Sequence, residues 1–529
     1  MAAEDSVNQG TTEKRADDIE IGEKHASIVD APLKAGDVEI LDEAELFLQE
    51  NGISHAHLTG LLEDKEAEKK LMRRVDWSLM PLLCGTYLLQ YIDKQALGYG
   101  AVFDLFTSTG MTNDQYSWMA SIFYFAYLVA EWPASYMAQH YPTGKVVSLC
   151  VICWGTILTC TAACQNFTGL AICRFLLGVF EAVITPCFMM TISMWYTRKE
   201  APSRAGTFYC FNGVGSMVGG ILFYAVGQAK GFDVWRIIFI LSGGLTVCWG
   251  VVLYLFLPDN IMSAKRFSTE QKAVLIARTQ SGRTGVFSRK IKAYQIKEAF
   301  CDTQVWLLFF FVLLNEVVNG GIANFGKLIV KGFTKDALLT TAYGIPQGAW
   351  SAFFVFTGPW CASRFRNART AIMGIWVLPT LIGAICLLKL ERTNKNGLLM
   401  AYYISSSFVG SLVIALQMPA GNLGGYTKRV TATALVFLAY CAGNIIGPHA
   451  FLSNEAPVYQ TGCKTIIGCV AGQIAISVAL RLVLISRNKK RDAAAGQVGT
   501  VGDGEGEGSD DSELLDITDF QNPAFRYSY

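Results

Sequence analysis

The sequence predicts an all-α membrane protein with twelve transmembrane helices in two six-helix halves. Three observations predict this fold class. The 529 residues are 52% hydrophobic and only 16% charged, which is too apolar for a water-soluble chain. Apolar runs of about 20 residues, the length that crosses a bilayer core about 30 Å thick, recur along the chain. A polar segment then divides these runs into two groups of six.

The N-terminal part is expected to form a tail followed by the first half. Residues 1–74 are polar and acidic and turn basic just before the first apolar run. They contain no apolar core of a signal peptide, so we expect a disordered cytosolic tail that stays on the chain. The first half, 75–258, is expected to hold spans at 76–104, 116–137, 145–164, 167–193, 205–227 and 236–257.

A polar middle loop and a second half are expected to follow. Residues 259–303 carry scattered Lys and Arg and would be a cytosolic loop. The second half, 304–486, is expected to hold spans at 304–326, 338–360, 370–389, 398–420, 430–452 and 464–486. This places Lys327, Lys331 and Lys335 in an outer loop and leaves 487–529 as a tail. Twelve is even, and the basic residues beside the spans put both termini in the cytosol.

Several classes of function are excluded by composition and motif. A net charge of +1 offers no field for nucleic acid. Most of the 15 cysteines lie in apolar runs, where they act as small packing residues, and five histidines make a metal site improbable. The run GVGSMVGG (213–220) follows no strand, so it indicates close helix packing rather than phosphate binding. We find no catalytic constellation and therefore expect neither an enzyme nor a cofactor.

Charged residues inside the spans are the candidate functional residues. A charge at the bilayer centre costs about 2.5 to 3.5 kcal/mol on insertion scales, so each needs a partner or a purpose. The charges expected inside spans are Asp93, Lys94, Glu131, Arg174, Glu181, Glu316 and Arg481.

Asp93, Arg174 and Glu181 fall at similar depths. Arg174 and Glu181 are two helical turns apart, so they share a face and lie about 10 Å apart along the axis. Asp93 lies about 24 Å along its span and Arg174 about 10 Å along a span that starts from the other side. A contact between Asp93 and Arg174 is therefore geometrically feasible. It would be either a structural ion pair or a proton site. A proton site is feasible because burial raises the pKa of a carboxyl group and a movable Arg lowers it.

The other intramembrane charges leave alternatives open. Lys94 suits an anionic substrate group, or it snorkels to the outer surface. Glu131 fits gating or loop anchoring as well as proton transfer. Glu316 lies in LNEVVNGGIANFG with Asn319 and Asn324, where Gly320 and Gly321 are predicted to interrupt the helix and expose its backbone. Glu316, Asn319 and Asn324 are thus additional polar candidates.

Several motifs resemble those of one transporter superfamily. YIDK (91–94), AYLVAEWP (126–133) and RFLLGVFEA (174–182) are similar to elements of the anion:cation symporters of the major facilitator superfamily. Lys94 replaces the Arg of the first element, and Ala126 and Glu131 depart from the second. The run SMWYTRKEAPSRAGTFYCFNGVGSMVGG, VNGGIANF and the closing ITDFQNPAFRYSY resemble fungal allantoate permease-type carriers.

The resemblance implies a mechanism and roles for individual residues. It implies that Asp93 and Glu181 exchange protons and that Arg174 couples them. Tyr91, Lys94 and Tyr127 would face the substrate, and Asn212 would be a further polar contact. Two halves would rock around a midplane site.

The expected function is proton-coupled uptake of a small organic anion. The anion would be a carboxylate such as allantoate, nicotinate, pantothenate or a related vitamin or nitrogen source. The carrier would lie in the plasma membrane, with the anion, protons and the lipid bilayer as partners and no obligate protein partner. Two alternatives remain: export of an acidic metabolite, and a nutrient sensor that binds without transporting.

Overall fold

The computed structural model describes residues 47, 51, 65–197, 200–229, 232–281, 292–365, 367–496, 517–523 and 525–529. These residues form helices, turns and connecting segments, and no strand. The chain divides into two compact units, which are Met1–Met80 with Thr191–Pro202 and Pro258–Thr284, and Pro81–Met190 with Ser203–Leu257 and Gly285–Tyr529. Most of the expected N-terminal tail, residues 282–291 of the expected middle loop and residues 497–516 lie outside the described residues.

In the first unit an arginine lies between two carboxylates. It contains the start of α4 (Lys65–Val102), the end of α9 (Ile184–Trp195) and α12 (Thr269–Ser281). Arg278 of α12 pairs with Glu68 of α4, and its Nη2 lies 2.6 Å from Glu200 Oε1. Part of the segment expected to be a polar loop is thus a helix with an anchored guanidinium.

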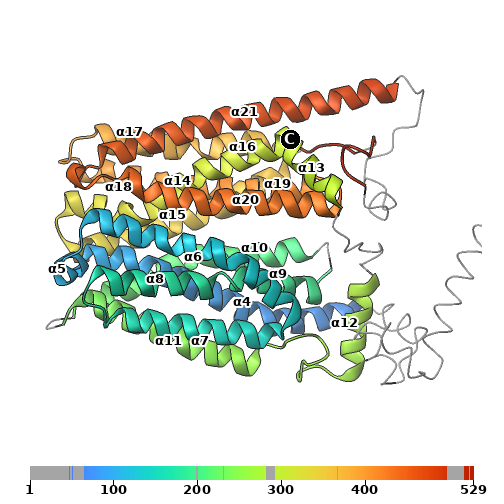
Figure 1. The fold of residues 1–529 in the computed structure, drawn as a ribbon, viewed down its shortest axis with the longest axis horizontal. Helices are drawn as coiled ribbons and strands as arrows, with labels where there is room; N and C mark the ends of the chain where they lie inside the picture. Colours follow the sequence, from blue (N-terminus) through green and yellow to red (C-terminus); the bar gives the residue numbers. More distant parts are fainter. Residues whose placement is uncertain are drawn as a thin grey trace, which may run out of the picture. The chain divides into compact units, whose positions relative to one another are not determined.

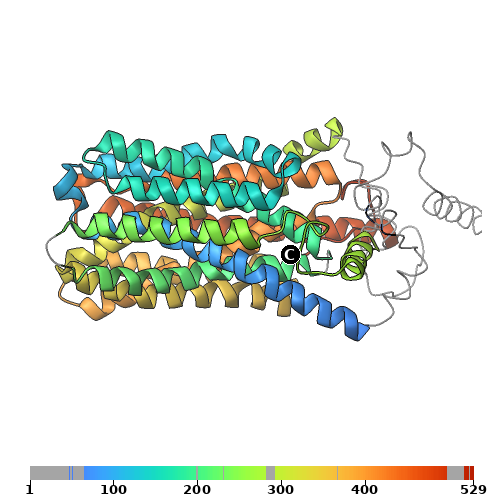
Figure 2. The same ribbon diagram turned by 90° about the horizontal axis from the view of Figure 1, so that it is seen from below.

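In the second unit the helices run lengthwise side by side in both views (Figure 1 and Figure 2). Its first half comprises most of α4, α9 and α10 together with α5 to α8 and α11. The bounds are α5 (Leu105–Thr109), α6 (Asn113–His140), α7 (Thr143–Thr161), α8 (Phe167–Glu181), α10 (Ala201–Val226) and α11 (Val234–Phe256).

The second half begins with the short helix α13 and continues through α21. The bounds are α13 (Ala293–Cys301), α14 (Thr303–Thr334), α15 (Ala337–Arg364), α16 (Arg369–Trp376), α17 (Leu378–Lys389), α18 (Lys395–Ile404), η1 (Ser405–Ser407), α19 (Phe408–Asn422), α20 (Tyr426–Ile446), η2 (Gly447–Ala450), η3 (Ser453–Glu455) and α21 (Gln460–Gly496). We call the end of this half where α14 begins and α15 ends the tail end, and the opposite end the far end.

The predicted fold class is confirmed, since a helix or helix pair covers each of the twelve expected spans in order. The fourth and ninth spans each consist of two successive helices, and in the tenth span the short helix η1 joins α18 to α19. In the described part of the chain, nine stretches are long and apolar enough to cross a membrane by composition alone. The helices α4, α6 and α15 are not among them, and α4 and α6 are two of the helices that carry charged candidate residues.

The break between α8 and α9 has a local cause in Pro186. Proline has no backbone N–H, and its ring collides with the carbonyl group four residues earlier, so it kinks or breaks a helix unless it lies in the first turn. Accordingly α8 ends at Glu181 and α9 begins at Ile184. The break leaves Glu181 in the last turn of α8, in the interior of the bundle.

Two expectations about α14 are wrong. The helix passes unbroken through Gly320 and Gly321. A Cβ at Gly320 would stand 3.0 Å from the carbonyl oxygen of Asn444, so this glycine allows α20 to approach closely. The helix also continues to Thr334, so Lys327 is not in an outer loop but lies within α14, with 4% of its surface exposed.

Close contact between α7 and α11 also depends on glycine. A Cβ on Gly243 of α11 would overlap Thr159 Oγ1 and stand 2.6 Å from the Thr159 nitrogen. A Cβ on the adjacent Gly244 would meet no atom within 4 Å. The two glycines therefore provide a matched pair, one at a helix crossing and one in open space.

We expect Gly243→Ala to destabilise the protein by about 1 to 3 kcal/mol, because the added methyl group forces α7 and α11 apart. Gly244→Ala should be neutral or stabilising by up to about 1 kcal/mol, because alanine favours a helix. The midpoint of thermal unfolding in detergent compares them. Equal midpoints for the two variants would contradict this packing.

Candidate functional site

An ion pair between the half-buried Lys94 of α4 and the buried Glu181 of α8 lies at the centre of the candidate site. Glu181 Oε1 lies 2.8 Å from the Lys94 Nζ, and the side chain of Glu181 is 3% exposed. The same oxygen accepts a hydrogen bond of 2.9 Å from Gln90 Nε2. Gln90 and Lys94 are one helical turn apart, so both project from one face of α4 toward Glu181.

Lys94 turns into the bundle toward Glu181, which is not the snorkelling geometry that the sequence left open. Its side chain keeps 31% of its surface accessible. Its ammonium group also lies 5.7 Å from the ring centre of Phe123 on α6, and it interacts through space with Glu316 of the other half. Lys94 therefore contacts the first half while its charge also acts on the second.

Asp93 and Arg174 lie near this pair but do not form an ion pair with each other among the described residues. Asp93 Oδ2 accepts a hydrogen bond of 2.8 Å from Thr246 of α11, and its Oδ1 has no partner. Arg174 is 5% exposed, and its Nε and Nη2 have no hydrogen-bond partner. Both side chains interact electrostatically with Glu181. The contact considered from the sequence is thus not formed in this structure.

Aromatic side chains from both halves meet where α6 packs against α20. Tyr127 of α6 is 6% exposed, and its ring centre lies 5.7 Å from that of Phe437 on α20. Tyr124 and Tyr440 face each other across the same two helices, with ring centres 6.3 Å apart. Tyr127, one of the residues predicted to face the substrate, therefore lies at the boundary between the halves.

Tyr91 and Asn212 lie at neighbouring helix contacts. Tyr91 is half-buried on α4. A Cβ on Gly215 of α10 would stand 3.1 Å from the Cβ of Tyr91, so the two helices are close here. Asn212 is half-buried on α10, directly before Gly213 at the contact with Ala352 of α15. Tyr91 thus lies where α4 packs against α10, and Asn212 lies beside the contact of α10 with α15 of the second half.

The polar candidates of α14 form a second cluster. Glu316 is fully buried, and its Oε2 accepts hydrogen bonds of 3.0 Å from Asn319 and 2.5 Å from Asn444 of α20. Its Oε1 has no partner. Asn444 is a contact that the sequence analysis did not identify, because nothing in the apolar run around it indicates which helix it faces. Glu131, by contrast, is half-buried on α6 with its Oε2 unpartnered.

Hydrogen bonds join the two halves at the far end. Tyr116 donates to the carbonyl oxygen of Asn324 at 3.0 Å. The next residue of α6, Ser117, and Ser121 one turn beyond it donate to the carbonyl oxygens of Pro448 and Ile445 at 3.2 and 2.8 Å. Asn324 therefore takes part through its backbone, in a contact that links α6 to α14 and the end of α20.

Lys327 is the functional candidate that sequence reasoning missed. Its ammonium group lies 4.3 Å from the ring centre of Tyr99 and 3.3 Å from the position of a Cβ on Gly98. Gly98 is one helical turn beyond Lys94 on the same face of α4. No carboxylate pairs with Lys327 among the described residues. The apolar residues on both sides of it in NFGKLIV were the available signal.

This arrangement is that of a membrane carrier, in which two helical halves enclose buried polar groups. The described residues contain no group of three His, Cys, Asp or Glu side chains that could hold a metal ion. The model of the Major Facilitator Superfamily matches residues 83–448, and the chain belongs to this superfamily. It is therefore a multi-pass membrane transporter for a small-molecule substrate.

Individual relatives agree with this assignment. An uncharacterized transporter of Schizosaccharomyces pombe is 33% identical over 94% of both chains. The allantoate permease of Saccharomyces cerevisiae is 29% identical over 88% of this chain and 87% of its own length. A solved D-xylose-proton symporter shares the fold with a TM-score of 0.58 at 11% identity, covering 76% of this chain and 97% of its own. All three are transporters, in agreement with the expectation that the chain is not an enzyme.

Proposed function

We propose that the chain is a proton-coupled carrier that takes up a small organic anion, a carboxylate of the allantoate class, across the plasma membrane. The proposal includes the orientation expected from the basic residues beside the spans, with both termini in the cytosol. The observation that carries this proposal is the ion pair of the half-buried Lys94 with the buried Glu181. The similarity to allantoate permease supports the substrate class and the membrane.

The ion pair supplies a physical reason for coupling. A substrate carboxylate that binds Lys94 competes with Glu181 for the same ammonium group. A buried charge that loses its partner is penalised by several kcal/mol. Glu181 therefore takes up a proton when the anion takes its place at Lys94, and it releases the proton when the pair forms again.

Asp93 and Arg174 provide a second pairing for the other state of the cycle. Asp93 Oδ1 lacks a donor, and Arg174 has buried donors without acceptors. A small shift of α8 against α4 would bring these complementary groups together, and buried unsatisfied groups favour such a shift. In this proposal Asp93 is the second proton site, and Arg174 couples it to Glu181.

Lys327 extends the anion site into the second half. The ammonium groups of Lys94 and Lys327 lie along one face of α4 and come from opposite halves. An anion held by both would draw the halves together. Burial without a carboxylate partner disfavours the charged form of Lys327, so pairing with a substrate carboxylate would stabilise its ammonium form.

We expect Glu181→Gln to abolish accumulation driven by a pH gradient while exchange of substrate between the two sides stays measurable. The amide cannot take up or release a proton, but it leaves Lys94 free to bind the anion. Uptake of radiolabelled allantoate into liposomes with an alkaline interior measures accumulation, and preloaded liposomes measure exchange. The control is Glu391→Gln, on an exposed turn. Accumulation at the normal level would remove Glu181 from the proton path.

We expect Lys327→Gln to weaken binding of the anion about 10- to 100-fold, since a charge-assisted hydrogen bond contributes about 1.5 to 3 kcal/mol. The matched control is Lys331→Gln, one turn further along α14 and half-buried. Titration of the thermal unfolding midpoint with allantoate reports the affinity. Equal affinities of the two variants would exclude Lys327 from the anion site.

The same liposomes separate this proposal from the two alternatives. Net loss of preloaded anion against its gradient, driven by protons moving the other way, would favour an exporter. Ligand-induced stabilisation without any movement of anion would favour a sensor. A preliminary thermal-shift screen of small carboxylates selects the probe if allantoate does not bind.

A further inference from the structure

The closing segment of the chain packs against the tail end of the second half. We call residues 517–529 the C-terminal segment; all of them except residue 524 are described. The surface that receives it, which we call the cradle, is formed by the end of α19, the start of α20 and the end of α21. The cradle residues are Asn422, Gly424, Lys428, Arg487, Asn488 and Arg491.

Asp519 is the charged anchor of the C-terminal segment. It is fully buried, and its Oδ1 lies 2.7 Å from the Nζ of Lys428, which is also fully buried. Its Oδ2 accepts a hydrogen bond of 2.6 Å from the hydroxyl group of Tyr527. Lys428 also pairs with Glu298 at 2.8 Å and Asp302 at 3.0 Å. The C-terminal segment thus supplies, through Asp519, the third carboxylate around the Lys428 ammonium group.

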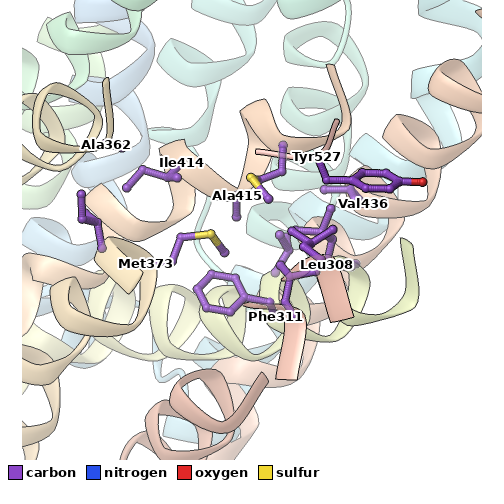
Figure 3. Packing of buried hydrophobic residues seen from close by; sticks show 14 residues of the cluster. Leu308, Phe311, Ala362, Met373, Ile414, Ala415, Val436 and Tyr527 are labelled. Atoms are coloured by element: carbon purple, nitrogen blue, oxygen red, sulfur yellow. The ribbon is translucent and has the colours of Figure 1, made fainter. Parts of the chain in front are cut away.

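Tyr527 is the apolar anchor. Its side chain is 2% exposed and packs in a cluster with Leu308, Val436 and Leu484. Figure 3 shows the Tyr527 ring at the edge of the cluster beside Val436, with its hydroxyl group pointing away from the cluster. Burial and the neighbouring Asp519 raise the pKa of this hydroxyl group, so it remains a neutral donor.

Two asparagines of the cradle hold the backbone of the segment. Asn488 donates to the Tyr527 carbonyl at 2.8 Å and accepts from its N–H at 3.0 Å. Asn422 does the same with Ser528, at 2.7 and 2.9 Å. Paired contacts to the backbone N–H and carbonyl group also bind an extended peptide at the edge of a sheet. Here asparagine side chains make these contacts in place of a strand.

The cradle has space for this backbone only because residue 424 is glycine. A Cβ on Gly424 would overlap the nitrogen of Asp519 and stand 2.9 Å from the carbonyl carbon of Thr518. The Gly424 nitrogen donates to Asp519 Oδ1 at 3.2 Å. On the opposite side, Arg491 Nη2 donates to the Asp519 carbonyl at 2.5 Å. Shape, charge and backbone contacts therefore all select the same segment.

We propose that the cradle is a peptide-recognition site whose ligand is the C-terminal segment of the same chain, and that the bound segment holds the tail end of α20 in place. Lys428 lies about 14 Å along α20 from Phe437, at 1.5 Å per residue. Phe437, Tyr440 and Asn444 are the residues by which α20 borders the candidate site. Asp519 is thus a positioning residue, and this inference depends on neither the substrate nor the direction of transport proposed above.

The binding test uses the full chain with a specific protease site inserted between residues 497 and 516. After purification in detergent the chain is cut, and size-exclusion chromatography with mass spectrometry follows the released C-terminal segment. We expect the segment to stay with the carrier. Immediate separation of the wild-type segment would overturn the proposal.

Variants test which contacts retain the segment. Removing one partner of a buried charge pair weakens binding strongly, so we expect Asp519→Asn to weaken retention at least about 30-fold. Arg526→Ala is the control, because its ion pair with Asp492 is exposed at 42% and 63%. Equal retention of the Asp519→Asn and wild-type segments would contradict recognition by Lys428.

A competition experiment avoids any change in the folded carrier. Excess synthetic peptide 517–529 is added to the cut wild-type protein, and we expect it to exchange with the bound segment. The same peptide with Asp519→Asn should exchange at least about 30-fold less well. Equal exchange by both peptides would overturn the proposal even if the Asp519→Asn chain fails to fold.

Hydrogen exchange tests the positioning of α20. After the cut segment is washed away, amides of residues 426–437 should exchange faster, while those of α7 and α11 stay unchanged. Adding wild-type peptide should restore the slow exchange. Unchanged exchange in residues 426–437, or a change that added peptide does not reverse, would show that the segment does not hold α20.

Discussion

The ion pair of Lys94 and Glu181 is the constraint on which the rest of the candidate site depends. Two charges removed from water are stable together only when their geometry is good and their remaining hydrogen bonds are satisfied. Here Gln90 supplies the additional donor to Glu181. The break at Pro186 ends α8 at Glu181, where free carbonyl groups of the helix terminus also favour a nearby cation. The end of α8 and the buried carboxylate of the ion pair thus coincide at Glu181.

Buried polar groups around this ion pair differ in whether they have hydrogen-bond partners. The far end is closed by hydrogen bonds from α6 to backbone carbonyls of the second half. In the interior, by contrast, oxygens of Asp93 and Glu316 and donors of Arg174 lack partners. Buried unsatisfied groups are rare in proteins and commonly mark functional sites. Buried groups without partners beside the ion pair of Lys94 and Glu181 would allow the internal pairing to change.

The sequence predicted the spans well because apolar length is a local property. It also placed Arg174 and Glu181 on one face, since helical spacing is local too. It could not assign partners: Asp93 and Lys94 are adjacent, yet one faces Thr246 of α11 and the other Glu181 of α8. The seventh span was predicted to end just before Lys327, so this lysine was assigned to a loop and was not recognised as a candidate. The docking of residues 517–529 depends on contacts with residues that are distant in the chain, which no local pattern reveals.

Simultaneous recording of protons and anion tests the central claim most directly. Purified protein is placed in liposomes containing a pH-sensitive dye, with the membrane potential clamped, and radiolabelled allantoate is added outside. The account predicts that the interior acidifies in proportion to the allantoate that enters, because each anion at Lys94 requires a proton on Glu181. Entry of allantoate without acidification would contradict it.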